Sequence, residues 1–219
     1  MRKKMFFFLV FCLFILSGCS KKENNQHNVE NSTKIEKKDQ NKDYIYFDEV
    51  KTLLLNNGDK YVIQYPIVNF TTEESNSVNL ELKSVVNKNY RALKIENDKV
   101  QSGNILMFES FESDKYVSLV QTKKYYLNDS YLNDSVETYV FSKETGALLP
   151  KEKLLESFNY DENSFFEKIS TNLDSDDVSY SLMMIKQSDY RLYVKNNKLI
   201  LVYYDTDNEN EIKKEMIIE

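Results

Sequence analysis

Nonpolar residues recur at helical spacing most clearly between residues 78 and 93. The nonpolar positions there are Val78, Leu82, Val85, Val86, Tyr90 and Leu93. Spacings of three and four residues place these side chains on one face of a helix. Ser75 or Ser77 is the expected N-terminal cap, since a serine hydroxyl accepts hydrogen bonds from the first backbone N–H groups. Two shorter helices are predicted at residues 151–158 and 162–173, while residues 178–187 fit a helix or a strand.

Stretches rich in β-branched and aromatic residues predict strands between these helices. The expected strands are residues 44–55, 61–70, 105–111, 116–126, 136–142, 190–195, 198–204 and 211–218. Asn196-Asn197 forms a two-residue hairpin turn, because asparagine tolerates positive φ. The eight residues between two of the strands, 128–135 (NDSYLNDS), are expected to form a loop. In residues 116–126 neither face of the strand is cleanly nonpolar.

The tight turns and the interspersed helices together predict the fold class. Hairpin connections join neighbouring strands in antiparallel order, and amphipathic helices bury their nonpolar side against a sheet. The sequence therefore predicts an α+β domain with a mostly antiparallel sheet and helices packed on one face.

The first 19 residues are typical of a bacterial lipoprotein signal. Arg2, Lys3 and Lys4 precede a nonpolar run over residues 5–16, which is short for a transmembrane helix. Leu16-Ser17-Gly18-Cys19 resembles the lipobox of bacterial lipoproteins. That resemblance implies cleavage after residue 18, a lipid on Cys19 and a position on the extracytoplasmic face of the cell membrane. A plain secretory signal and an uncleaved helical anchor are the alternatives.

Composition divides the rest of the chain into a tether and a domain. Residues 19–43 contain few nonpolar side chains and are expected to be a disordered tether. Residues 44–219 are expected to form a single domain. From Tyr44 onward 20 basic and 30 acidic residues give a net charge of −10. Nucleic acid is therefore not expected as a partner, whereas a cationic protein is favoured.

The distribution of histidine and cysteine limits the chemistry that the domain could perform. His27 is the only histidine and lies in the expected tether, and Cys19 is the only cysteine after residue 18. We therefore expect no catalytic residue, no cofactor and no metal ligand. Asp205, Asp207 and Glu209 have the spacing of a calcium loop, but Asn210 and Met216 replace the glycine and glutamate that such a loop requires. An acidic turn is the expected reading. A pair of carboxylates that cleaves a glycan remains an alternative.

Several segments, taken in order, resemble the extracytoplasmic domain shared by the peptidoglycan deacetylase PdaC and the lysozyme-sensing anti-sigma factor RsiV. The segments are residues 61–67 (YVIQYPI), the 78–93 helix, residues 116–120 (YVSLV), Tyr125-Tyr126, residues 139–141, Thr145-Gly146, Leu154-Leu155, residues 165–169, 190–193 and 199–203. The resemblance covers most of residues 60–205. It implies a non-catalytic module that binds or senses an envelope component. Many relatives carry a Gly-Gly-Ala-His-like loop, for which residues 128–135 offer neither glycine nor histidine.

The 16 tyrosines and residues 128–135 are the remaining candidates for recognition. Tyrosine is favoured both in half-buried strands and at binding surfaces, so both interpretations stay open. We expect partner contacts at Asn128, Asp129, Tyr131, Asn133 and Asp134. The predicted function is a membrane-anchored module that binds a cell-wall glycan or a cationic envelope protein. The alternatives are an accessory structural lipoprotein without a ligand and a carboxylate-based glycan hydrolase.

Overall fold

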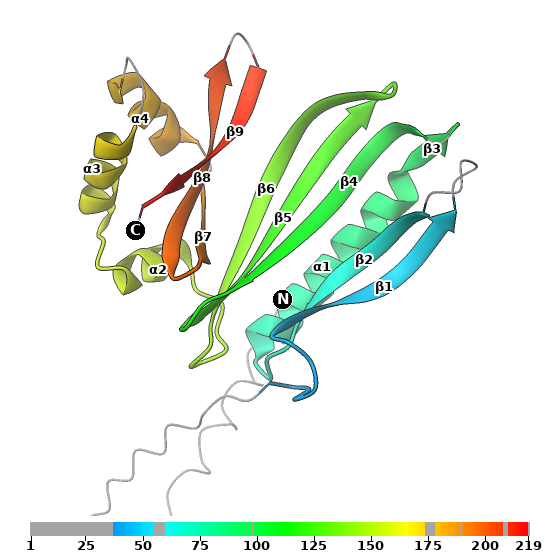
Figure 1. Ribbon diagram of the computed structural model, residues 1–219, viewed down its shortest axis with the longest axis horizontal. Coiled ribbons are helices and arrows are strands. Elements are labelled where there is room, and N and C mark those ends of the chain that lie inside the picture. The colour runs from blue at the N-terminus through cyan, green and yellow to red at the C-terminus, as the bar shows by residue number, and fades with distance from the viewer. Residues whose placement is uncertain are drawn as a thin grey trace, which may run out of the picture. The chain divides into compact units, whose positions relative to one another are not determined.

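The computed structural model describes residues 37–54, 60–97, 99–173, 178–188, 190–207 and 210–218. Within these ranges, four helices accompany three antiparallel sheets (Figure 1). The predicted α+β fold with mostly antiparallel strands is thereby confirmed. The expected signal peptide, together with Cys19, lies outside the described residues.

The first sheet is a two-stranded hairpin, and the longest described helix follows it in the sequence. Strand β1 (Ile45–Leu54) pairs with β2 (Lys60–Val68), and helix α1 (Glu73–Ala92) follows. The side-chain amide of Asn79 in α1 hydrogen-bonds to both the backbone N–H and the carbonyl of Val68, at 2.7 and 2.9 Å. The predicted helix is confirmed, but the predicted caps are wrong. Thr72 caps α1 instead, because the helix begins one turn earlier, at Glu73 and Glu74.

The central sheet has the order β3-β4-β5-β6. Its strands are β3 (Lys94–Glu96), β4 (Lys99–Glu112), β5 (Tyr116–Leu127) and β6 (Ser130–Ser142). Residues 117–122 of β5 are all buried. Val117 and Leu119 pack with Val78 and Leu82 of α1, whereas Val120 packs into the larger core on the other face. Because both faces of β5 are buried, its sequence does not alternate between nonpolar and polar residues, and neither face could be identified as the nonpolar one.

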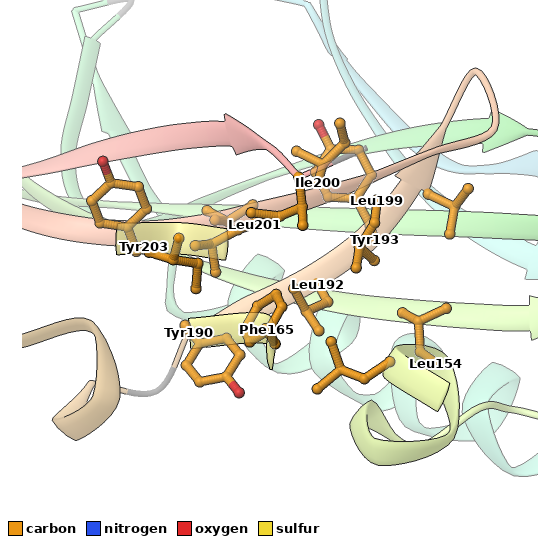
Figure 2. Close-up of a cluster of buried hydrophobic side chains, with 14 of the residues drawn as sticks. Leu154, Phe165, Tyr190, Leu192, Tyr193, Leu199, Ile200, Leu201 and Tyr203 are labelled. Atoms are coloured by element: carbon orange, nitrogen blue, oxygen red, sulfur yellow. The ribbon is translucent and has the colours of Figure 1, made fainter. Parts of the chain in front are cut away.

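The third sheet, β7-β8-β9, has helices on one face. It consists of β7 (Arg191–Lys195), β8 (Lys198–Asp207) and β9 (Asn210–Ile217). Leu154 of α2 (Lys151–Ser157), Phe165 of α3 (Glu162–Asn172) and Ile185 of α4 (Val178–Gln187) join its nonpolar side chains in one core (Figure 2). The ambiguous segment at residues 178–187 is thus a helix. As predicted, Asn196 and Asn197 form a positive-φ hairpin turn.

The central and third sheets are joined by side-chain contacts between β5, β6 and β7. The buried Ser118 hydroxyl of β5 accepts a hydrogen bond from the Val194 backbone N–H, at 2.9 Å. Arg191 of β7 forms a bidentate ion pair with Glu137 of β6, and both nitrogen–oxygen distances are 3.0 Å. A guanidinium matches a carboxylate in this way because its N–H groups form a rigid fork. These contacts join the edge strand β7 of the third sheet to strands β5 and β6 of the central sheet.

Residues before Tyr44 contact the folded domain. Lys37 forms a β-bridge with Phe70, and the Asn69 side chain donates hydrogen bonds to the carbonyls of Asp39 and Asp43, at 2.8 and 3.0 Å. The last residues of the expected tether, from Lys37 to Asp43, are therefore part of the folded unit. Their composition did not reveal this because the contacts are made through backbone carbonyls, which every residue carries.

Candidate partner-binding surface

The segment predicted as a loop, residues 128–135, is a two-residue turn followed by a strand. Asn128 and Asp129 adopt φ values of 52° and 60°, and β6 begins at Ser130. The loop prediction is therefore wrong. Positive φ at both central residues is the signature of the hairpin turn whose twist matches that of the strands. Strand pairing continues to the very end of the hairpin, where Leu127 lies opposite Ser130.

All five residues predicted to contact a partner lie on this hairpin. Asn128, Asp129, Tyr131 and Asn133 are exposed, and Asp134 is half-buried. Lys124 lies opposite Asp134, and Tyr125 lies opposite Asn133. The hairpin thus places the five residues within one short stretch at the end of strands β5 and β6 (Figure 1).

Large nonpolar side chains are exposed at the same end of the hairpin. We call Tyr125, Leu127, Tyr131 and Leu132 the hairpin-tip surface, because all four are exposed. Side chains alternate along a strand, so Tyr125 and Leu127 project from one face of the sheet. Tyr131 lies opposite Tyr126 on the other face, and the two rings meet edge to face at 5.9 Å between centroids. The tip therefore presents nonpolar groups on both faces.

Polar groups surround the hairpin-tip surface. The Lys99 ammonium of β4 lies 2.8 Å from the Asp129 carboxylate, which ties the turn to the neighbouring strand. Partial burial raises the pKa of the Tyr131 phenol, and the nearby, hydrogen-bonded Asp134 raises it further. The single proton of the phenol is therefore directed to the Asp134 carboxylate. Exposed rings that carry a polar end are well suited to recognition.

Sequence reasoning missed Leu127 and Leu132 as part of this surface. The rule that identified Asn196-Asn197 as a hairpin turn applies equally to Asn128-Asp129, and it would have extended both strands to the turn. Leu127 and Leu132 would then have been recognised as exposed strand residues beside the expected tyrosines. The duplicated Asn-Asp-Ser sequence concealed this, because the second copy, Asn133 to Ser135, lies within β6.

The described tyrosines range from buried through half-buried to exposed. Tyr190, Tyr193 and Tyr203 are buried in the core, whereas Tyr125, Tyr131 and Tyr180 are exposed. Both interpretations of the tyrosines therefore apply, each to a different part of the molecule. Tyr125 and Tyr131 lie on the hairpin-tip surface, whereas Tyr180 lies on α4.

The acidic segment near the C-terminus is part of a hairpin. Asp205 pairs with Ile212 and Asp207 pairs with Asn210 across β8 and β9. Continuous strand pairing differs from the curved backbone of a calcium loop. In the described ranges no three His, Cys, Asp or Glu side chains gather to hold a metal ion. The same residues contain no helix of the length and nonpolar character needed to cross a membrane.

Comparison with known proteins does not identify a family for this chain, so its relation to the PdaC and RsiV domain stays a proposal. No protein-family model matches this chain, and no curated protein matches it at a significant level.

Proposed function

We propose that the chain is a lipid-anchored extracytoplasmic module that binds a cationic envelope protein without catalysis. The observation that carries this proposal is the hairpin-tip surface, where the β5–β6 hairpin exposes nonpolar side chains on both faces. Recognition residues commonly lie at the ends of rigid sheets. A tip that is nonpolar on both sides suits insertion into a groove of a partner.

Charge supports a cationic partner. The net charge of −10 from Tyr44 onward would attract a positively charged protein over long distances. The resemblance to a lysozyme-sensing domain agrees with this direction, since it points to a cationic protein as the partner. A cell-wall glycan is the competing ligand, and an accessory lipoprotein without a ligand is the competing function.

Binding of purified lysozyme and of isolated cell-wall glycan to the purified chain tests the proposal. Lysozyme serves as the cationic probe, and affinity is measured at about 50 and 300 mM salt, between which screening of exposed charges becomes much stronger. We expect binding at low salt and weaker binding at high salt. Binding to the glycan alone would favour the competing ligand, and binding to neither probe would contradict the proposal.

Two matched pairs of variants locate the contact. Tyr131→Ala changes a side chain that is 50% exposed at the tip, and Tyr180→Ala changes one that is 53% exposed on α4. Leu132→Ser and Leu80→Ser form the second pair, with exposed fractions of 51% and 71%. We expect each tip variant to weaken lysozyme binding about tenfold, the usual effect of losing an interface anchor. The two variants outside the tip should bind as the parent chain does. Equal losses within a pair would place the contact elsewhere.

A further inference from the structure

A cleft lies among α2, α3 and α4, on the helix-covered side of the third sheet. Its volume is about 360 Å³. Leu155, Tyr160, Phe166 and Tyr190 supply its nonpolar and aromatic lining. Small-molecule sites usually occupy about 300–1,000 Å³ and combine such a lining with a few polar groups. The cleft therefore has room for a small ligand, and its polar groups indicate which kind.

The hydroxyl group of Tyr190 is the first of these polar groups. Tyr190 is only 7% exposed, and its ring packs against Phe165 and Phe166 with centroids 5.8 Å away in each case. Figure 2 shows its hydroxyl pointing away from Phe165 and Leu192. No described residue forms a hydrogen bond with this hydroxyl, and its oxygen is not among the buried atoms that lack a partner, so it is open to the cleft and to solvent. The group is thus available to a ligand in the cleft that Tyr190 lines.

Two lysines of the cleft have no carboxylate partner among the described residues. The Lys151 ammonium lies 4.0 Å from the ring centroid of Tyr190, and the Lys186 ammonium lies 4.8 Å from that of Phe166. These contacts hold the two positive charges against the aromatic lining. A cation over a ring is stabilised by the negative face of the ring, but its charge is not neutralised.

Two glutamates of the same cleft have no basic partner in the described part of the chain. Glu152 and Glu162 line the cleft, and both carboxylates act electrostatically on Tyr190. The other two carboxylates of the lining have partners: Glu156 pairs with Lys153 at 2.7 Å, and Asp161 accepts a hydrogen bond from the Ser164 backbone N–H. Exposed charges of both signs therefore line one cleft and form no ion pair with one another.

We propose that this cleft binds a short zwitterionic peptide. Lys151 and Lys186 face the carboxylate of the peptide, Glu152 and Glu162 face its ammonium group, and the Tyr190 hydroxyl hydrogen-bonds to it. A ligand with only one sign of charge would be repelled by one of the two pairs. The proposal is independent of the hairpin-tip surface, because the two sites share no residue.

Titration of the purified chain with alanyl-alanine tests this inference. Amide chemical shifts report where the dipeptide binds, and we expect saturable changes at Glu162, Ser188 and Tyr190. The same dipeptide with an acetylated N-terminus and an amidated C-terminus carries no charge and should give no saturable change. Blocking one end only should weaken binding at least tenfold, because a hydrogen-bonded charged group that loses its partner is strongly penalised.

Variants of single cleft residues test whether the proposed contacts, and not a change elsewhere in the fold, determine the affinity for the dipeptide. Tyr190→Phe keeps the ring in the core and removes only the hydroxyl, so we expect about tenfold weaker binding. Glu162→Gln, at an exposed position, should also weaken binding. Tyr65→Phe, on β2 and outside both the cleft and the hairpin-tip surface, serves as the control and should leave affinity unchanged. The proposal is overturned if the fully blocked dipeptide binds equally well, if the shift changes lie outside the cleft, or if no saturable change occurs up to the solubility limit.

Discussion

Tyr193 combines a fully buried ring with a hydroxyl that reaches a carboxylate. The ring stacks on Phe111, with centroids 5.3 Å apart, and the hydroxyl donates a hydrogen bond to Glu215 at 3.2 Å. Burial, followed by the charge of Glu215, raises the pKa of the phenol well above its usual value of 10.0. Burial and then Glu81 act in the same direction on the pKa of Tyr139. The folded state therefore favours the neutral form of both tyrosines.

These raised pKa values predict a loss of stability in alkaline solution. The unfolded tyrosines release their protons near pH 10, whereas the folded ones keep them, so their contribution to stability is complete below pH 10 and is lost as the pH rises further. We expect the free energy of unfolding, measured with urea, to fall above pH 10.

Tyr193→Phe serves as the test of this prediction. It should be less stable at pH 7, by about 1 kcal/mol for the lost hydrogen bond, but should lose less stability between pH 10 and 12 than the parent chain. An equally steep loss in the variant would show that Tyr193 does not contribute. Tyr125→Phe, at an exposed position, is the control.

The burial of individual tyrosines could be predicted only in part. Strand propensity correctly placed Tyr190 and Tyr193 at the start of a hairpin, but it did not tell which face of that hairpin would be covered. Their burial depends on contacts with Phe165 and Phe111, which are distant in the sequence. The local sequence around a residue does not reveal its contacts with residues that are distant along the chain.

At the level of the secondary-structure elements, the backbone path of strand β4 depends on one glycine, Gly103. Gly103 has a φ of +114°, a conformation that residues with a side chain rarely adopt. A Cβ atom at this position would lie 3.0 Å from the Cα of Leu93 and 3.1 Å from the carbonyl oxygen of Ala92. Gly103 thus permits β4 to pass close to the C-terminal end of α1.

Replacement of Gly103 by alanine is expected to destabilise the fold strongly. Both the backbone conformation and the contact with α1 oppose a side chain there, and strained positions of this kind cost about 1–3 kcal/mol. Thermal unfolding of Gly103→Ala, with the neighbouring Ser102→Ala as a control, measures the effect. A melting temperature equal to that of the control would contradict the proposed close approach.

Elements with a strong local signal were predicted well, and their ends were not. Helix α1 and the β7–β8 hairpin follow from periodicity and from Asn196-Asn197. The predicted start of α1 was wrong because a contact outside the helix also holds the capping residue Thr72. Its hydroxyl donates a hydrogen bond to the Gly146 carbonyl, at 2.8 Å. That partner lies beyond β6 in the sequence, so local patterns favoured the nearer serines.

At the level of the whole molecule, the packing of one sheet on another was not predictable from the sequence. The turn between β4 and β5 meets the turn between β7 and β8, where the Asp114 backbone N–H donates to the Asn197 side chain at 2.9 Å. The Asn197 side chain in turn donates to the Asp114 carboxylate, also at 2.9 Å. Local periodicity identifies strands but does not determine which sheet they join or which sheets stack.

The proposed membrane anchor gives a prediction for the location of the whole chain. Cys19→Ala removes the sulfur that would carry the lipid, and two acyl chains are what make such anchoring stable. In a bacterium that processes lipoproteins, we expect the variant to be released into the medium or to remain as an uncleaved precursor. Detergent phase partitioning and the mass of the N-terminus measure both outcomes. A cleaved variant that still partitions into detergent would disprove the lipid anchor, and Ser20→Ala, outside the lipobox, is the control.

The contacts of Asn69 have a mechanical consequence. Its side-chain amide donates to carbonyls of Asp39, Lys42 and Asp43, and its side-chain oxygen accepts from the Asp39 backbone N–H. A force that pulls the chain from the N-terminal side of Lys37 is therefore transmitted first to the buried junction between β2 and α1. Several hydrogen bonds then share the load before strand β1 can be peeled away from β2. The fold is thus reinforced at the point where a tethered protein would experience tension.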